Sequence, residues 1–331
     1  MPVGQPLGEW RLLPRHRADP PIAGFFGISV DALLGVDAAA EQEKIDGYLR
    51  DFQAAISRGE IDDCIAIARA GVAEFPNSYA LLNKLMYALF VAGDDTGNIA
   101  EWKENMERYD AEIVALGERI IRHCPDQAIR LEATARLAFQ HCEMGRRAMG
   151  RALYETLPPM KACREANIWW GLEEDEKLPH TRAYLLQSYD QLCGAMWKLA
   201  KLLPPTDAQR VWEKMQALDA IIYDGPTPDH DWGNANLPFR MAKTHMQLNQ
   251  PDAALVCLRR AAEAARAFDE RPDEQTHESL LLGQRTERRT DFETADTRPL
   301  QHILRDKWLA DAVFDPIRGD AAFGEIIAGL N

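Results

Sequence analysis

The sequence predicts an all-α protein, and three observations lead to that fold class. Apolar residues recur at intervals of three and four, the spacing that gives a helix one buried face. Glycines and prolines then divide the chain into segments that are each the length of one helix. The alternation of polar and apolar residues that is typical of a half-buried strand is nearly absent. We therefore expect about a dozen antiparallel helices with short connections.

The helical spacing is clearest in three stretches of the chain. In each stretch the apolar positions fall on one face of a helix, so each helix is expected to bury that face against a neighbour. The positions are Leu81, Leu82, Leu85, Ala88, Leu89 and Ala92 in the first stretch, Ile113, Leu116, Ile120 and Ile121 in the second, and Leu255, Leu258, Ala261, Ala262 and Ala265 in the third.

Breaker and capping residues predict where the helices begin and end. Gly59 is expected to end one helix and Pro76 the next, after which Asn77 and Ser78 supply the N-cap chemistry of a third. Asp126 is expected to cap the helix that follows Pro125. The later boundaries are expected at Gly145, Pro158-Pro159, Pro179, Pro204-Pro205, Gly225 and Pro251.

Residues 237–266, LPFRMAKTHMQLNQPDAALVCLRRAAEAAR, predict the clearest helix pair. A first helix is expected to end at LNQ, and Pro251 to begin the second in its first turn, where proline is tolerated. The segment resembles a tetratricopeptide repeat, and residues 43–75 resemble a second, weaker unit. The resemblance implies an α-solenoid, a tetratricopeptide-like helical repeat of about a dozen antiparallel helices. The alternative is an irregular helical bundle.

Six side chains are candidates for a partner-binding surface. Trp169 and Trp170 are neighbours in the sequence, so at least one of them must face away from the core. Tryptophan is a common anchor in partner grooves, although core packing is the alternative. In a tetratricopeptide array the first helix of each pair lines the concave groove. The resemblance therefore implies that the groove contains Phe239, Arg240, Lys243 and Met246.

Residues 21–37, PIAGFFGISVDALLGVD, resemble the end of a helix-turn-helix domain. A short apolar helix ends at FFG, an extended turn follows, and Asp31 caps a second short helix. A run of the form IAxFFGVSVDELLG commonly closes this domain in XRE (Cro/C1-type) transcriptional regulators. The resemblance implies that residues 1–36 are the remnant of a helix-turn-helix head. It also implies that residues 37–331 are a tetratricopeptide-like effector or interaction domain.

The first 19 residues depart from that family. The run expected there, close to QSVSRWENGxxYPDIxLLP, is absent. If the codons of residues 2–19 are read one base forward, however, they permit QSVSRWENGxxYPDIxL. We interpret residues 1–19 as disordered or as an out-of-frame reading, and residues 20–36 as the last short helices, with an unrelated tail as the alternative. The helix that reads bases in the major groove would then be missing, so we expect weak DNA binding or none.

Composition supports a soluble cytoplasmic protein. The chain has 331 residues, with 38 Lys and Arg against 52 Asp and Glu, and a formal charge of −14. Such an acidic chain is repelled by phosphates, so it is a poor non-specific binder of nucleic acid or membranes. No apolar run approaches the roughly 20 residues of a membrane helix, and no signal peptide is evident. The six cysteines contain no CxxC pair.

Two other groups of residues have a structural interpretation that we favour. His123-Cys124 and His141-Cys142 are metal-ligand residue types, but neighbours on a helix point in different directions, so we predict no metal. Residues 228–232, PDHDW, contain an Asp-His pair suited to general-base catalysis. No nucleophile or cofactor motif accompanies that pair, so we predict neither an enzyme nor a cofactor.

Two functions fit these observations. The first is the effector or sensor portion of an XRE-family regulator, which binds a peptide, protein or small molecule and reaches DNA only through a head missing from this chain. The second is a stand-alone tetratricopeptide-like scaffold for a protein partner. Because XRE-type regulators commonly pair on DNA half-sites, the resemblance also implies a homodimer.

Overall fold

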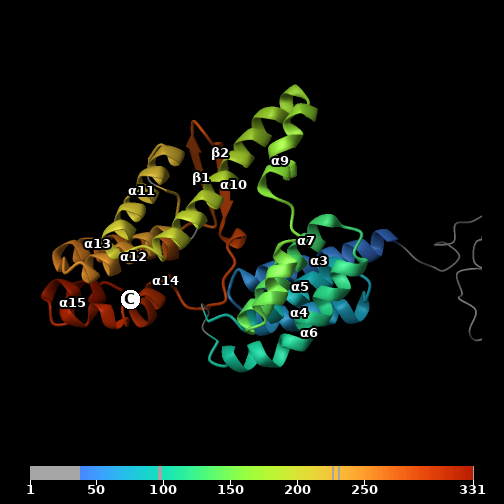
Figure 1. The fold of residues 1–331 in the computed structure, drawn as a ribbon, viewed down its shortest axis with the longest axis horizontal. Coiled ribbons are helices and arrows are strands. Elements are labelled where there is room, and N and C mark those ends of the chain that lie inside the picture. The colour runs from blue at the N-terminus through green and yellow to red at the C-terminus, as the bar shows by residue number, and fades with distance from the viewer. Residues whose placement is uncertain (1–37, 96–98, 226, 230–231, 331) are drawn as a thin grey trace, which may run out of the picture.

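The computed structural model describes residues 38–95, 99–225, 227–229 and 232–330, and most of these residues are helical. The all-α fold class predicted from the sequence is thereby confirmed. The remnant head predicted for residues 1–36 lies outside the described residues. The described helices gather into two halves that lie next to each other, with a long arm and a β-hairpin beside them (Figure 1).

The first half is a bundle of six helices in which each helix packs against the next. Its core is formed by large side chains that are fully buried, among them Phe52, Ile56, Met86 and Ile120. The helices are α3 (Ala38–Ile56), α4 (Ile61–Glu74), α5 (Tyr79–Ala92), α6 (Trp102–His123), α7 (Gln127–Glu143) and α8 (Arg147–Tyr154).

Capping explains several of these boundaries. The Asp126 side chain accepts hydrogen bonds from the backbone N–H groups of Ala128 (2.7 Å) and Ile129 (3.2 Å), as expected for an N-cap. Ser78 lies at the N-cap of α5 as predicted, but its side chain makes no capping hydrogen bond. Gly59 adopts a positive φ of 75° between α3 and α4, a conformation that favours glycine.

The second half contains the helix pair predicted for residues 237–266. The first helix, α12 (Gly233–Gln247), ends where the LNQ run begins, and α13 (Pro251–Glu270) has Pro251 in its first turn. Asn249 adopts a φ of 56° in the connecting turn. Preceding and following elements complete this half: α10 (Glu174–Ala200), α11 (Pro205–Tyr223), α14 (Leu300–Ile303), the π-helical turn η6 (Leu304–Trp308), the 3₁₀ segment η7 (Ala312–Ile317) and α15 (Ala321–Ala328).

A long arm separates the two halves in the sequence. It comprises the short turns η3 (Met160–Ala162), α9 (Arg164–Asn167) and η4 (Ile168–Gly171), and it leads into α10 of the second half. The boundary predicted at Pro179 is wrong, because Pro179 lies inside α10. As the sixth residue of the helix it removes one i→i−4 hydrogen bond, while a Glu173–Glu176 capping box stabilises the first turn.

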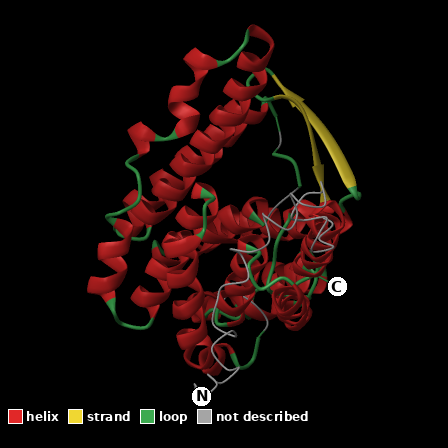
Figure 2. Cartoon of the chain, turned by 90° about the vertical axis from the view of Figure 1, so that its right-hand side faces the viewer, coloured by secondary structure: helices red, strands yellow, loops and turns green. Residues whose placement is uncertain are grey.

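One β-hairpin interrupts the described helices, and the sequence did not predict it. Strand β1 (Glu274–Ser279) pairs antiparallel with β2 (Gly283–Arg288), with Thr276 opposite Thr286. Figure 2 shows the two strands standing beside the long helices. Both strands consist mainly of polar and charged residues, so the apolar alternation that marks a half-buried strand is missing. Leu282 at the turn is buried against Tyr223 and anchors the hairpin to α11.

After the hairpin the chain crosses back to the first half, through the 3₁₀ turn η5 (Arg289–Asp291) and on to Pro299. We call residues 289–299 the crossing segment. The Thr294 N–H donates to the Ile56 carbonyl (3.2 Å), and the Tyr87 hydroxyl donates to the Glu293 carboxylate (2.7 Å). Ala295 packs against the core of the first half. The two halves are thus joined by segments far apart in the sequence (Figure 1).

Candidate functional site

The candidate site is a cleft between α10, α11 and α12, which we call the α10–α12 cleft. Its cavity has a volume of about 230 Å³. Aromatic and apolar side chains from all three helices form its walls, and polar groups stand among them. The side chains that line the cleft and could contact a ligand include Tyr189, Cys193, Trp197, Trp212, Met215, Asp219, Tyr223, Asn236, Leu237 and Arg240.

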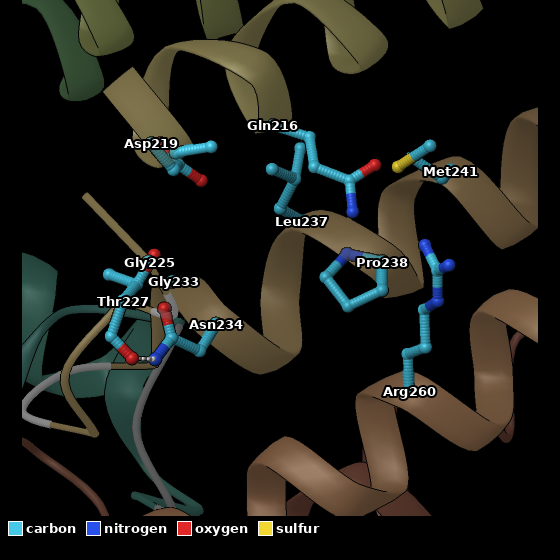
Figure 3. Close-up of a pocket in the computed structure, with 11 residues that line it drawn as sticks. Gln216, Asp219, Gly225, Thr227, Gly233, Asn234, Leu237, Pro238, Met241 and Arg260 are labelled. Atoms are coloured by element: carbon cyan, nitrogen blue, oxygen red, sulfur yellow. Dashed lines mark hydrogen bonds between the residues drawn. The ribbon is translucent and has the colours of Figure 1, made fainter. Parts of the chain in front are cut away.

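A second pocket of about 300 Å³ lies between α11, α12 and α13. Gln216 and Asp219 reach into it from α11, and Arg260 approaches from α13 (Figure 3). Leu237 and Pro238 of α12 lie between these two groups (Figure 3). Because Asp219 of α11 and Leu237 of α12 line both cavities, the two cavities adjoin each other at the first turns of α12.

The loop that enters α12 is held by backbone-directed hydrogen bonds. The Asn234 side-chain amide donates to the carbonyls of Thr227 (3.2 Å) and Pro228 (2.9 Å). Asp224 adopts a left-handed conformation, with φ of 54°, where α11 ends. These features fix the approach of the chain into α12 and so the position of its cleft-facing side chains.

The walls of the cleft are held by side-chain hydrogen bonds between helices. The Tyr189 hydroxyl of α10 donates to the Asp219 carboxylate of α11 (2.6 Å). Burial, together with this bond to a carboxylate, raises the pKa of Tyr189, so its hydroxyl stays protonated. The Trp212 indole N–H donates to the Thr244 hydroxyl (3.2 Å), which ties α11 to α12. The cleft is therefore largely preformed.

Arg240 supplies a positive charge to the cleft. Its Nε donates to the Asn236 side chain (3.3 Å), and its guanidinium lies 5.5 Å from the centre of the Phe239 ring. No carboxylate of the described residues forms an ion pair with it. Burial lowers the pKa of Arg240, and the more distant Asp311 carboxylate offsets this only in part, so the charge is incompletely compensated. An anionic group of a ligand would compensate it.

The other three residues predicted on α12 do not line this cleft. Phe239 is buried between Trp308 (5.1 Å between ring centres) and Phe314 (6.0 Å), so it belongs to the core rather than to an open groove. Lys243 forms an ion pair with Asp311. Met246 is half-buried against the core of the second half. Of the four residues, the structure brings only Arg240 to the cleft.

Trp169 and Trp170 lie on η4, away from the α10–α12 cleft, since η4 packs near the N-terminal end of α10. Their rings meet edge to face, with centres 4.8 Å apart. The Trp170 side chain is 85% exposed, whereas Trp169 is 36% exposed and has the Lys177 ammonium 4.9 Å from its ring centre. Neither tryptophan is a core residue.

Sequence reasoning missed the aromatic walls of the cleft, although their spacing carried a signal. Tyr189, Cys193 and Trp197 follow one another at intervals of four, and Trp212, Asp219 and Tyr223 also recur at helical spacing. Each set falls on one face of its helix. Polar residues such as Asp219 interrupt the apolar stripe on these helix faces, so the stripe does not stand out in the sequence.

Thr227 and Gly233, which flank the PDHDW run of residues 228–232, line the cleft, whereas His230 and Asp231 lie outside the described residues. Within the described part of the chain, no three His, Cys, Asp or Glu side chains gather as a metal site would require. His141 lies beside Arg146, whose Nε donates to its Nδ1 (2.9 Å), and burial lowers the pKa of His141.

Comparison with known proteins gives no relative for this chain. No family model matches it, and neither the curated proteins nor the solved structures contain a significant match. Among the helices of the described residues, none combines the length and apolar composition needed to cross a bilayer.

Proposed function

We propose that residues 38–330 are the effector-binding portion of an XRE-type transcriptional regulator, built as a tetratricopeptide-like array. The observation that supports this proposal most is the α10–α12 cleft, in which aromatic walls surround one incompletely compensated arginine. Such a combination of apolar surface and a few oriented polar groups is typical of ligand sites. A ligand in the cleft contacts three helices and favours their present arrangement.

The effector that fits this cleft is a small amphipathic anion. Its apolar body would pack against Trp197 and Trp212, and its anionic group would pair with Arg240. We further propose that these residues do not read DNA sequence, since a net charge of −14 opposes approach to phosphates. The proposal includes a cytoplasmic location and no enzymatic activity.

A fluorescence titration with 8-anilinonaphthalene-1-sulfonate, an aromatic anion, tests ligand binding by the cleft. The parent chain is expected to bind the dye saturably, and Arg240→Gln to weaken binding about tenfold because one charge-assisted hydrogen bond is lost. Arg210→Gln removes an exposed charge elsewhere on α11 and serves as the matched control. Equal dye affinity for the parent and Arg240→Gln would contradict the proposed site.

The link to XRE regulators is tested by the nucleotide sequence. If codons 2–19, read one base forward, encode QSVSRWENGxxYPDIxL, the regulator is supported. If they do not, the link to these regulators fails. A gel shift in which the chain binds one DNA sequence specifically at moderate salt would contradict the proposal that it reads no DNA.

The exposed Trp170 favours a second candidate function, that of a protein-interaction scaffold. Exposed tryptophans commonly anchor protein partners. If the scaffold is correct, Trp170→Ala removes capture of the partner while Arg240→Gln leaves it intact. The regulator proposal expects the opposite dependence for effector binding.

A further inference from the structure

A third cavity, of about 600 Å³, lies where the two halves meet, and we call it the junction cleft. The turn after α3, the end of α13 and the crossing segment form its walls. Its volume falls within the range of small-molecule sites. The side chains that decide its chemistry are Arg58, Phe268, Arg271, Arg289, Phe292 and Arg298.

Two of the four arginines have carboxylate partners. Arg58 pairs with Glu60 (2.5 Å), and both Nε and one terminal nitrogen of Arg298 contact the Asp296 carboxylate (2.9 and 2.6 Å). These contacts neutralise both charges locally. Arg271 and Arg289 are the two remaining arginines of the cleft, and neither has a carboxylate partner of this kind among the described residues.

Arg271 and Arg289 lie close together at the end of α13. One terminal nitrogen of Arg289 donates to the carbonyls of Asp269 (2.8 Å) and Arg271 (2.7 Å). The Arg271 guanidinium lies 3.5 Å from the centre of the Phe268 ring and donates to the Phe268 carbonyl. Neither guanidinium forms an ion pair with a carboxylate of the described residues.

The carboxylate nearest in the sequence is committed elsewhere. Asp269 accepts hydrogen bonds from the backbone N–H groups of Leu300 (2.7 Å) and Gln301 (3.0 Å), where it holds the beginning of α14. Asp269 and Asp229 attract the Arg271 guanidinium through space, but neither forms an ion pair with it, so its charge is only partly compensated. Burial first, and then the neighbouring Arg289, lower the pKa of Arg271 to about 10.

We propose that the junction cleft binds the phosphate group of a small molecule, with Arg271 and Arg289 as its two cations. A phosphate monoester carries nearly two negative charges, which matches the two guanidinium groups that form no ion pair within the described part of the chain. Its oxygens accept hydrogen bonds from several directions, as two arginines on different segments require. The Phe268 and Phe292 rings, 5.1 Å apart, offer an apolar wall for a planar organic portion.

This site is separate from the α10–α12 cleft, and the inference does not depend on the proposed regulatory function. The junction cleft lies between the two halves, so a ligand bound in it could stabilise their present arrangement. Arg58 belongs to the first half, Arg271 to the second, and Arg289 begins the crossing segment. A bound phosphate ester in this cleft would therefore contact both halves at once and stabilise the crossing segment.

Isothermal titration calorimetry of the full chain, in low-salt buffer free of phosphate, tests the proposal. The probes are phenyl phosphate, inorganic phosphate and succinate. We expect saturable binding of phenyl phosphate, weaker binding of inorganic phosphate and no comparable binding of succinate. Arg271→Gln and Arg289→Gln should each weaken phenyl phosphate binding about tenfold or more, while Arg210→Gln changes it less than about twofold.

Circular dichroism checks the fold of each variant. If Arg271→Gln does not fold, Arg289→Gln still decides the question, because Arg289 is exposed and is not a core residue. No saturable binding by the parent chain, or unchanged affinity in Arg289→Gln, would overturn the site. Tighter binding of succinate than of phenyl phosphate would overturn the phosphate class.

Discussion

Asp110 illustrates how single residues hold the first half together. It lies on α6 and receives two hydrogen bonds from Arg146 (2.8 and 2.6 Å), which precedes α8, and one from Gln140 of α7 (3.0 Å). The Arg146 bonds are the main reason that the pKa of Asp110 is lowered. One carboxylate thus joins three consecutive elements of the bundle.

Asp110→Asn should lower the free energy of unfolding by about 1–3 kcal/mol, because charge-assisted hydrogen bonds are lost in a partly buried site. Urea unfolding at pH 7 measures this change. Glu155→Gln removes the exposed Arg151–Glu155 pair and should change stability little. Equal effects of the two substitutions would contradict the structural role of Asp110.

Asp110 should also make the free energy of unfolding depend on pH. A carboxyl whose pKa is lower in the folded than in the unfolded chain stabilises the fold above its unfolded pKa, near 4. That stabilisation is lost as the pH falls through the lower pKa that the carboxyl has in the folded chain. The stability difference between the parent and Asp110→Asn should therefore shrink below about pH 4.

At the scale of elements, the crossing segment depends on a close backbone approach. A Cβ atom on Gly59 would lie 2.6 Å from the carbonyl carbon of Asp296, and Gly59 also has a φ of 75°. Gly145 has the same φ, but nothing lies within 4 Å of its Cβ position. The two glycines thus share the backbone requirement and differ only in the contact.

Gly59→Ala should therefore destabilise the protein by more than Gly145→Ala. Gly145→Ala carries the backbone penalty alone, about 1 kcal/mol, whereas Gly59→Ala adds a clash with the crossing segment. Thermal unfolding of both variants measures the difference. Equal losses of stability would mean that the crossing segment does not pack on the α3–α4 turn as described.

The sequence predicted those elements whose boundaries are determined by residues close together in the chain. The α12–α13 pair followed from periodicity and Pro251, and the α7 cap from Asp126, because those signals act within a few residues. The hairpin could not be found in this way, since its anchor is a tertiary contact between Leu282 and Tyr223. Phe239 was misplaced for a similar reason, because only the fold brings Trp308 and Phe314 to it.

The candidate sites also depend on contacts between segments that are distant in the sequence, which local patterns do not reveal. Arg240 was identified because it lies on the first helix of a recognisable pair. Its partners in the cleft come from α10 and α11, and no local pattern indicates that these helices converge. The arginines of the junction cleft come from separate segments, and Arg58 is more than 200 residues away from the other three along the chain. Only the folded structure shows which of their charges lack a carboxylate.

At the scale of the whole molecule, two helical halves each have their own core and share the crossing segment. The two proposed ligand sites lie within the second half and at the junction, where binding would change the balance between arrangements of the helices. The overall charge of −14 is thus compatible with sites for anions, because local arginines rather than the net charge decide what each cleft binds.

The central claim is that the α10–α12 cleft binds an amphipathic anion, and hydrogen exchange of the full chain with 8-anilinonaphthalene-1-sulfonate tests it most directly. We expect added protection at residues 189–197, 212–223 and 236–240, since a bound ligand stabilises the helices that contact it. Protection should be lost in Arg240→Gln and retained in Arg210→Gln. Protection confined to other segments, or none at a saturating concentration of the dye, would contradict the account.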